Sequence, residues 1–463
     1  MADESVVTAP RHGLLGRWSA MVIVFAVLIS ARFAIVGADT YWAVALGRDI
    51  VRAGAIPDGI PFAAAPSAGW PNVPVLGELI FAGLAQPGPV GIVAAQLVVD
   101  AVALVLLALG ARRAGASDVA TAVAVALTAI GALSALASVK MQLFSLALFP
   151  VLLLLLRADH RRPTHRIWWV VLVIAAWGNV HGAVLLGVAV TGAYLLFSRL
   201  RHSPVETLAI GLASLVAVAA NPALFQTVHY YAGVLTNEAA RRGTELWARP
   251  NPGNLFDLLL IGAGVVLVVL ALLSRPPLWE VVSILGLLVG TVSSARHGVW
   301  LLMVCAAPTA LRLSRRSQAP VTRLSPAVPL VAAGLVVLLG GAGLLWTRQD
   351  ALNPSGSPEL LNAVKSVAQG EAVLADEPVV ESLAAEGVRI WLSNPIDAFQ
   401  QSDQAAYLDF ASGAVTGNSE ALLDAAGVVV VRTGGPADGL VSTDAGFAPD
   451  RSVAGWTVYT RVR

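Results

Sequence analysis

The sequence predicts an α-helical polytopic membrane protein with about eleven transmembrane helices and a small C-terminal extracytoplasmic α/β domain. Three observations lead to this prediction. Of the 463 residues, 57% are hydrophobic and 13% are charged, which is about half the charged fraction of an ordinary soluble domain. Apolar runs of about 15–20 residues alternate with short basic clusters. Residues 359–463 differ in kind, because polar and apolar stretches are mixed there.

The apolar runs define a predicted transmembrane domain over residues 1–347, with a first long outer loop at 37–87. Each run suits a helix that crosses a hydrocarbon core of about 30 Å, the shorter ones with tilt or local adaptation. We read the first run as a retained anchor, because Leu28-Ile29-Ser30-Ala31 is not a clear cleavage site. The predicted spans are 18–36, 88–110, 118–138, 142–157, 167–178, 183–198, 206–220, 254–274, 278–294, 298–313 and 327–346.

Arginine-rich loops predict the orientation of these spans. Most of the positive charge lies in alternate loops, such as those around Arg112-Arg113 and Arg161-Arg162. Cytoplasmic loops carry such an excess. We therefore expect a protein of the cytoplasmic (plasma) membrane whose N-terminus lies on the inner, cytoplasmic side. An odd number of spans then puts the chain after about residue 347 outside.

A linker at 348–358, rich in proline, serine and glycine, leads into the predicted outer domain at 359–463. Strands that alternate with helices indicate an α/β arrangement. The predicted strands are 372–375, 388–392, 427–432 and 456–462, and the predicted helices are 359–369, 378–386, 396–411 and 418–426. The domain has no phosphate-loop motif. We interpret it as structural or substrate-positioning, with a direct part in the chemistry as the alternative.

The first outer loop contains the acid that we single out. Asp39 stands directly after the first span and is followed closely by Tyr41 and Trp42. A carboxylate at such a boundary can be partly buried, which raises its pKa and suits it to accept a proton or to bind a divalent cation. Tyr41 opens a segment that we expect to be an amphipathic helix in the membrane interface. The other acids of the loop are Asp49 and Asp58, expected at the surface, and Glu78, whose role stays open.

Four further turns place polar side chains at the predicted outer ends of spans. Ionisable groups at membrane depth are costly, so each is a functional candidate. They are Lys140 and Gln142, Asn179 and His181, Glu245, and Arg296 with His297. The structural alternatives are interface anchors and polar contacts between helices. Because all of them share the side of Asp39, we predict an outer site of one carboxylate and several cations, which suits a lipid-linked phosphate and a sugar or another polyol.

These motifs resemble those of GT-C-type polytopic membrane glycosyltransferases, in particular the bacterial, polyprenyl-phosphate-sugar-dependent members. Asp39-Thr40-Tyr41-Trp42 is similar to the start of their first outer loop. Lys140-Met141-Gln142 resembles an Arg-Pro-Gln-type turn, with Lys and Met in place of Arg and Pro. Further short matches are Trp177-Gly178-Asn179-Val180-His181-Gly182, Asn221-Pro222, Glu245-Leu246-Trp247 and Ser294-Ala295-Arg296-His297. The resemblance covers nearly the whole chain.

The resemblance implies transfer of a sugar from a polyprenyl-phosphate donor to a glycan, lipid or protein acceptor at the outer face of the membrane, by a displacement that inverts the sugar. It implies Asp39 as the catalytic base and Lys140 and Arg296 as ligands of the donor phosphate. It implies Asn179 and His181 as contacts of the sugar or the acceptor. As further substrate contacts we select Tyr41, Trp42, Glu78, Gln142, Glu245 and His297.

The first outer loop departs from the family in one respect. Many members have two adjacent acids there, whereas Thr40 follows Asp39 in this chain. We therefore expect no metal site and no required cofactor, and keep a divalent cation, magnesium or manganese, as an alternative. The net charge of +1 argues against a nucleic-acid partner.

Two other classes of function stay open. A lipid-linked glycan polymerase or ligase that uses lipid diphosphates would depend on Arg241, Arg242 and His229 in the outer loop. A lipid or solute transporter would have repeated halves and helices broken at mid-membrane, and the sequence indicates neither.

Overall fold

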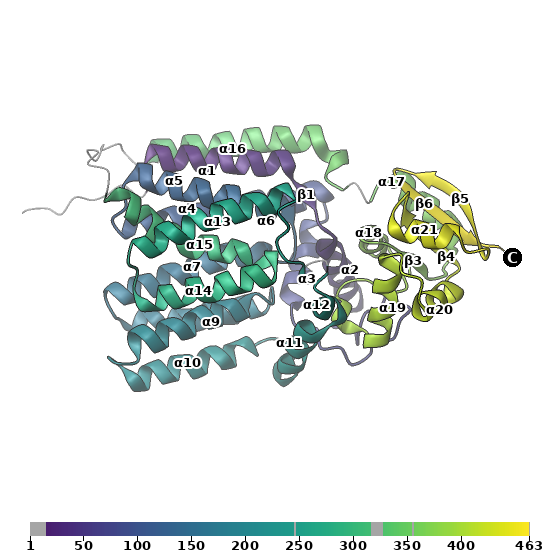
Figure 1. The fold of residues 1–463 in the computed structure, drawn as a ribbon, viewed down its shortest axis with the longest axis horizontal. Helices are drawn as coiled ribbons and strands as arrows, with labels where there is room; N and C mark the ends of the chain where they lie inside the picture. Colours follow the sequence, from purple (N-terminus) through teal and green to yellow (C-terminus); the bar gives the residue numbers. More distant parts are fainter. Residues whose placement is uncertain (1–14, 245–246, 316–326, 354–355, 463) are drawn as a thin grey trace, which may run out of the picture.

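A computed structural model of the chain describes residues 15–244, 247–315, 327–353 and 356–462. The membrane half is a bundle of helices that run roughly alongside one another, and the C-terminal residues form a separate α/β layer at one end of it (Figure 1). The helices of the bundle are α1 (Arg17–Phe33), α4 (Pro89–Arg113), α5 (Asp118–Gly131), α6 (Leu133–Ala137), α7 (Leu143–Arg161), α8 (Trp169–Gly178), α9 (Val184–Tyr194), α10 (Pro204–Val218), α13 (Leu255–Leu273), α14 (Leu278–Ser293), α15 (Gly298–Ser314) and α16 (Ala327–Arg348).

Every predicted span coincides with helix in the structure. The third predicted span is two helices, α5 and α6, because the chain turns at Ala132. By length and composition alone, three of the described helices are long and apolar enough to cross a membrane, namely α4, α7 and α13. The number of crossings therefore stays a prediction.

Burial separates the centre of the bundle from its outside. Every residue of α15 from Gly298 to Ala310 is buried, and its Trp300 ring packs edge-on against Phe149 at 5.4 Å between centroids. On the outer helix α10, by contrast, Val205 is 81% exposed and Leu212 66% exposed. Large apolar side chains that face outward from a helical bundle are suited to hydrocarbon rather than water.

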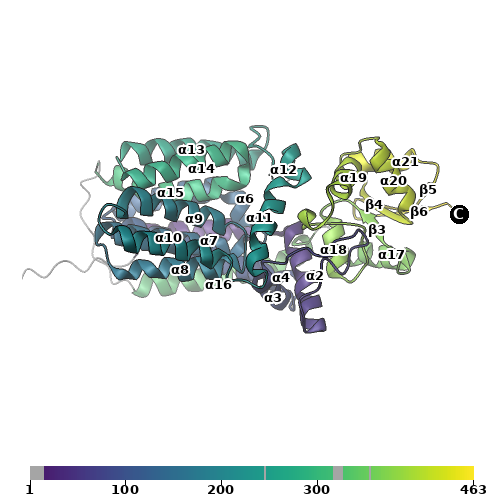
Figure 2. The same cartoon turned by 90° about the horizontal axis from the view of Figure 1, so that it is seen from below.

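Short elements fill the space between the bundle and the C-terminal layer (Figures 1 and 2). They are β1 (Ile35–Val36), α2 (Ala38–Ala53), α3 (Val75–Leu84), β2 (Ser138–Val139), α11 (Thr227–Thr236) and α12 (Glu238–Arg242). The predicted helix after Asp39 is α2, but it has no open face at its start. Residues 40–47 are all buried, because α3 packs on one side of α2 and a helix of the C-terminal layer on the other. The expectation of an interfacial helix is therefore wrong for this segment.

The C-terminal layer is a four-stranded sheet in the order β3-β4-β6-β5, in which only β3 and β4 run parallel. Its strands are β3 (Val373–Ala375), β4 (Val428–Arg432), β5 (Phe447–Val453) and β6 (Trp456–Arg461), and its helices are α17 (Pro358–Ala368), α18 (Val379–Ala385), α19 (Gln401–Ala411), α20 (Gly417–Ala425) and α21 (Pro436–Ser442).

Three features of this layer differ from the sequence prediction. One is α21, a helix that the sequence did not predict. The predicted strand at 388–392 contributes only isolated bridges from Ile390, to Ala63 and to Val373. β5 was not predicted, because it is a mostly exposed edge strand whose Pro449, Asp450 and Arg451 hide its strand character.

Direct contacts fix the C-terminal layer against the outer loops. The Ala64 amide donates to the Ile390 carbonyl at 2.8 Å, and the Arg48 guanidinium donates to the Ala385 carbonyl at 2.6 Å. The layer is thus positioned to form part of a site at this end of the bundle. Part of the predicted linker, residues 354–355, lies outside the described residues.

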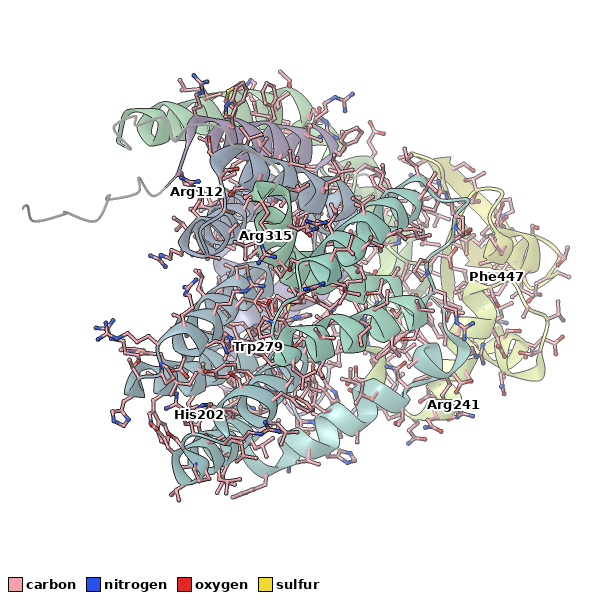
Figure 3. All side chains as sticks on the ribbon, turned by 60° about the vertical axis from the view of Figure 1, so that its left-hand side comes forward. Arg112, His202, Arg241, Trp279, Arg315 and Phe447 are labelled. Atoms are coloured by element: carbon pink, nitrogen blue, oxygen red, sulfur yellow. The ribbon has the colours of Figure 1, made fainter. Side chains whose placement is uncertain are left out.

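The arginine-rich loops and the C-terminal layer lie at opposite ends of the bundle. In Figure 3, Arg112 and His202 lie toward the end of the bundle away from the C-terminal layer, whereas Arg241 lies beside that layer. The arginine-rich loops of the predicted cytoplasmic side are therefore at the opposite end from the outer loops and the C-terminal layer.

Candidate active site

A short parallel strand pair brings Asp39 and Lys140 to the same place. β1 pairs with β2 so that the Gly37 amide donates to the Val139 carbonyl at 2.8 Å. The Thr40 hydroxyl donates to the same carbonyl at 2.9 Å. The first turn of α2, with Asp39, therefore starts where β2 ends, at Lys140. Residues about a hundred positions apart are joined here by backbone geometry.

Asp39 lies in the first turn of α2, where the helix dipole favours a carboxylate. Burial raises the pKa of the Asp39 carboxyl, while the charges of Lys140 and Arg296 and a hydrogen bond from the Trp42 side chain lower it. None of the ion pairs between described residues involves Asp39, Lys140 or Arg296. The carboxylate and the two cations are near enough to influence each other, yet they are not neutralised by direct contact.

Arg296 is held by an aromatic ring. It lies in the single turn between α14 and α15, and its guanidinium stacks on the Trp247 ring, 3.7 Å from the ring centroid. The Ala295 amide donates to the Ala248 carbonyl at 3.0 Å, which fixes this turn to the Trp247 segment. A stacked guanidinium keeps its in-plane N–H donors free for a phosphate.

These groups line one cavity of about 460 Å³. Its charged lining residues are Asp39, Lys140, Arg249, Asp257, Arg296 and Asp397. The same cavity is lined by aliphatic side chains of several helices, namely Leu185, Leu186, Val234, Leu235, Leu260 and Val299. Cations beside an aliphatic wall suit a ligand with an anionic head and a hydrocarbon tail.

The His181 ring lines this cavity, and its hydrogen bonds determine which ring nitrogen carries the proton. The Trp177 indole donates to the Ser145 hydroxyl oxygen at 2.6 Å, and the Ser145 hydroxyl lies 2.9 Å from Nδ1 of His181. The Ala183 amide also donates to this Nδ1, at 3.2 Å. Nδ1 is therefore an acceptor, and Nε2 carries the proton. Burial and the charge of Arg296 lower the pKa of His181 to about 3, so that the ring is a neutral donor.

Most of the predicted site residues meet at the cavity. Its lining includes Asp39, Trp42, Lys140, Gln142, His181, Arg296 and His297. Among the described residues that line the cavity, the buried side-chain polar atoms without a hydrogen-bond partner are His297 Nδ1 and the Tyr231 hydroxyl. Such buried polar atoms are available to a ligand.

Three predicted residues lie away from the cavity lining. Tyr41 is buried within α2. Glu78 is fully buried in α3 and accepts a hydrogen bond from Asn72 at 2.7 Å. The Asn179 side chain donates to the carbonyls of Ala175 and Ala220, as in a contact between helices. Glu245 lies outside the described residues.

The cavity also contains residues that sequence reasoning did not select. Tyr230 and Tyr231 come from α11, in the outer loop between the seventh and eighth predicted spans. Asn394 and Asp397 come from the C-terminal layer, more than three hundred positions after Asp39. Nothing in the local sequence marks the last two, because their place depends on how the layer docks on the loops.

The donor set gives little support to a metal ion. Among the described residues, no group of three or more His, Cys, Asp or Glu side chains could hold one. The charges that act on Asp39 include two cations, Lys140 and Arg296, and like charge close by disfavours a divalent cation. Burial, with a smaller contribution from the negative charge of Asp39, raises the pKa of Glu381 of α18 to about 8.

The arginines on which a polymerase or ligase would depend are paired elsewhere. Arg241 and Arg242 both form ion pairs with Glu238, at 3.3 and 3.0 Å. Arg242 also pairs with Asp409 of α19 at 2.7 Å. Neither arginine lines the cavity. Arg242 fastens α12 to the C-terminal layer instead.

The fold of the chain is that of GT-C-type membrane glycosyltransferases, as its likeness to solved structures shows. ArnT from Cupriavidus metallidurans, solved with bound undecaprenyl phosphate, is similar with a TM-score of 0.56 and 13% sequence identity, covering 96% of this chain and 97% of ArnT. The apo state of ArnT gives a TM-score of 0.54 at 12% identity, covering 96% and 98%.

A second enzyme has a similar fold. The archaeal oligosaccharyltransferase AglB from Archaeoglobus fulgidus, solved with an inhibitory peptide and a dolichol-phosphate, has a TM-score of 0.51 at 13% identity, covering 90% of this chain and 69% of AglB. No family model and no curated protein matches the sequence itself. These likenesses confirm the GT-C fold that the motifs indicated.

Proposed function

We propose that this protein is a membrane glycosyltransferase that transfers a sugar from a polyprenyl-phosphate donor to an acceptor hydroxyl. The observation that carries the proposal is the shared cavity, in which Asp39, Lys140 and Arg296 stand beside an aliphatic wall. ArnT was solved with undecaprenyl phosphate and AglB with a dolichol-phosphate. Proteins of the same fold therefore bind lipids that combine an anionic phosphate with a long hydrocarbon chain.

The chemistry follows from the charges. The Asp39 carboxylate takes the proton of the acceptor hydroxyl, and the freed oxygen attacks the anomeric carbon. The bond from that carbon to the phosphate oxygen breaks, and the polyprenyl phosphate leaves with the electron pair. Lys140 and Arg296 are fixed positive charges where negative charge develops, so they stabilise the transition state. A single displacement inverts the anomeric centre, and none of these steps calls for a cofactor.

The polar surroundings suit their parts in this scheme. His181 offers its Nε2–H to a phosphate oxygen or to a sugar hydroxyl. Trp42 donates to Asp39 and, with the charges of Lys140 and Arg296, opposes the rise that burial causes in the pKa of this carboxyl.

We place the reaction at the outer face of the cytoplasmic membrane. The arginine-rich loops support a cytoplasmic location for the end of the bundle opposite the cavity. With about eleven crossings, the N-terminus is inside, and the C-terminal domain at 359–463 is outside with the first outer loop. The aliphatic wall of the cavity lets a lipid-anchored donor reach the site from the outer leaflet.

The test is the Asp39→Asn variant of the full chain in detergent or proteoliposomes. Loss of the base should lower sugar transfer by at least about a hundredfold. Binding of undecaprenyl phosphate, measured as a shift in thermal unfolding, should persist, because Lys140 and Arg296 remain. Asp49→Asn is the matched control: Asp49 is on the same helix, paired with Arg52 at 2.9 Å. Near-normal turnover by Asp39→Asn would refute the assignment of the base.

A further inference from the structure

A second hollow adjoins the cavity on the side of the C-terminal layer. It has a volume of about 420 Å³, within the usual range of ligand sites. Three segments build it: residues 66–71 of the first outer loop, α11, and residues 397–400 of the C-terminal layer. His229 and Gln400, both exposed, stand on its lining. Water-soluble ligands can therefore enter it.

The chemistry of this hollow differs from that of the cavity. The cavity is lined by Lys140, Arg249 and Arg296, whereas no lysine or arginine stands among the described residues that line the hollow. Its walls combine aromatic rings with hydrogen-bonding groups, and the side chains in question are Trp70, Tyr230, Phe399, His229, Asp397 and Gln400. A phosphate would lack a cation here, and a hydrocarbon chain would meet a polar carboxylate and amide.

Neutral polyols suit such a lining. A sugar ring presents C–H faces, which pack on aromatic rings, and hydroxyl groups, which a carboxylate and an amide can hydrogen-bond. The hollow thus complements the cavity, which selects a phosphate and a lipid tail.

Two residues belong to both spaces. Tyr230 and Asp397 line the hollow and also the cavity that contains Asp39. The Trp70 indole donates to Oδ2 of Asp397 at 3.0 Å, and the Trp70 and Tyr230 rings lie 6.0 Å apart between centroids. These contacts fix the boundary side chains, so that a molecule seated in the hollow meets the cavity at a defined point.

We infer that this hollow binds the acceptor, and that the acceptor is a neutral, hydroxyl-bearing saccharide. The inference rests on the proposed function. The terminal sugar passes the boundary at Tyr230 and Asp397 and presents a hydroxyl to Asp39. The donor remains in the cationic cavity. The C-terminal layer then has a specific role, because it supplies one wall of the acceptor site.

Saturation-transfer NMR on the detergent-solubilised full chain tests the inference. The probes are neutral tri- and tetrasaccharides of hexose and pentose units, with an uncharged tetrapeptide for comparison. At least one saccharide should bind. His229→Ala and Gln400→Ala should each weaken that binding about threefold to tenfold, as loss of a ligand hydrogen bond does. Matched controls are His202→Ala, at the other end of the bundle, and Gln401→Ala, which is exposed beside Gln400 but does not line the hollow.

Binding of undecaprenyl phosphate to the same samples separates the two proposals. If the lipid binds but no saccharide does, or if saccharide binding survives the His229 and Gln400 variants, the inference is overturned and the proposed function stands. Preferential binding of the tetrapeptide would also overturn the inference. If neither lipid binding nor sugar transfer can be detected, the proposed function itself fails.

Discussion

Ser145 donates its hydroxyl proton to Nδ1 of His181, across 2.9 Å, because the Ala183 amide also donates to this nitrogen, at 3.2 Å, and so identifies it as an acceptor. The Ser145 oxygen in turn accepts the Trp177 indole N–H at 2.6 Å. Ser145 and Trp177 are both fully buried, so neither can exchange this contact for water. The arrangement leaves His181 one way to act, as a neutral donor through Nε2. Ser145 and Trp177 are therefore positioning residues for a group that faces the cavity.

Substitution of His181 can test this geometry. A glutamine amide can place an N–H donor near the position of Nε2, while an asparagine amide reaches only the position of Nδ1. We expect His181→Gln to keep most of the donor affinity and His181→Asn to lose about tenfold, as measured by the KM for the donor. Equal loss in both variants would argue against donation from Nε2.

The pH dependence of sugar transfer should follow the ionisation of the Asp39 carboxyl. Burial raises its pKa above the ordinary value, and Lys140 is the strongest of the groups that lower it. A base acts only when deprotonated, so kcat/KM should rise with pH through the pKa of Asp39. Lys140→Met removes the lowering charge, raises this pKa and moves the acid limb of the profile to higher pH.

The control for this shift is the chain's other lysine. Lys365 is in α17 of the C-terminal layer, pairs with Glu386 and stands far along the chain from the cavity. Lys365→Met should leave the acid limb in place. An unmoved limb in Lys140→Met would show that another group controls it.

The sequence predicted those features that depend on local pattern or on membrane sidedness. Hydrophobic runs located the helices of the bundle to within a few residues, and the rarity of polar groups at membrane depth identified Lys140, His181 and Arg296. The same reasoning could not distinguish Glu78, which is buried within α3, from a residue that lines the cavity. In the sequence, Glu78 and the cavity residue Asp39 both appear as isolated acids of the first outer loop.

Contacts between distant segments were beyond such reasoning. Asp397 reaches the cavity because residues 63–65 of the first loop lie alongside Ile390 and Trp391. No periodicity encodes this docking: a strand was predicted at 388–392, but nothing in the sequence indicates that Ile390 bridges to Ala63 of the first outer loop. The sequence predicts a structural or substrate-positioning role for the C-terminal domain, but only the three-dimensional arrangement identifies the residues involved, Asn394 and Asp397.

Gly37 should be intolerant of even a methyl group. A Cβ at this position would lie 2.7 Å from the Val139 carbonyl oxygen, so β1 and β2 would have to separate. Because this pair holds Asp39 next to Lys140, we expect Gly37→Ala to reduce turnover by about tenfold or more, as small displacements of catalytic groups do. The effect on thermal stability should be modest, about 1–3 kcal/mol.

A second glycine provides the comparison. Gly83 is inside α3, and nothing lies within 4 Å of the position of its Cβ. Gly83→Ala should be as stable as the wild type or more so, by up to about 1 kcal/mol, because alanine favours helix, and its turnover should be unchanged. If Gly37→Ala behaves in the same way, the strand pair does not set the geometry of the site.

Glu78 should make stability fall as pH rises. Burial raises the pKa of its carboxyl from 4.5 to about 8 in the folded chain, against the smaller lowering effect of the Asn72 hydrogen bond. Between these two values the folded state holds a proton that the unfolded state has released. The stability contributed by this proton is complete below about pH 4.5 and is lost as the pH approaches about 8. Glutamine has no such proton, and its amide oxygen can still accept the hydrogen bond from Asn72.

The Glu78→Gln variant should therefore become progressively more stable than the wild type as the pH is raised from about 5 to 8, by up to a few kcal/mol. The measurement is thermal unfolding of both proteins over this pH range. Glu420→Gln is the control, because Glu420 is exposed at the start of α20, and its difference from the wild type should stay constant. A constant difference for Glu78→Gln as well would mean that the fold holds the Glu78 carboxyl ionised.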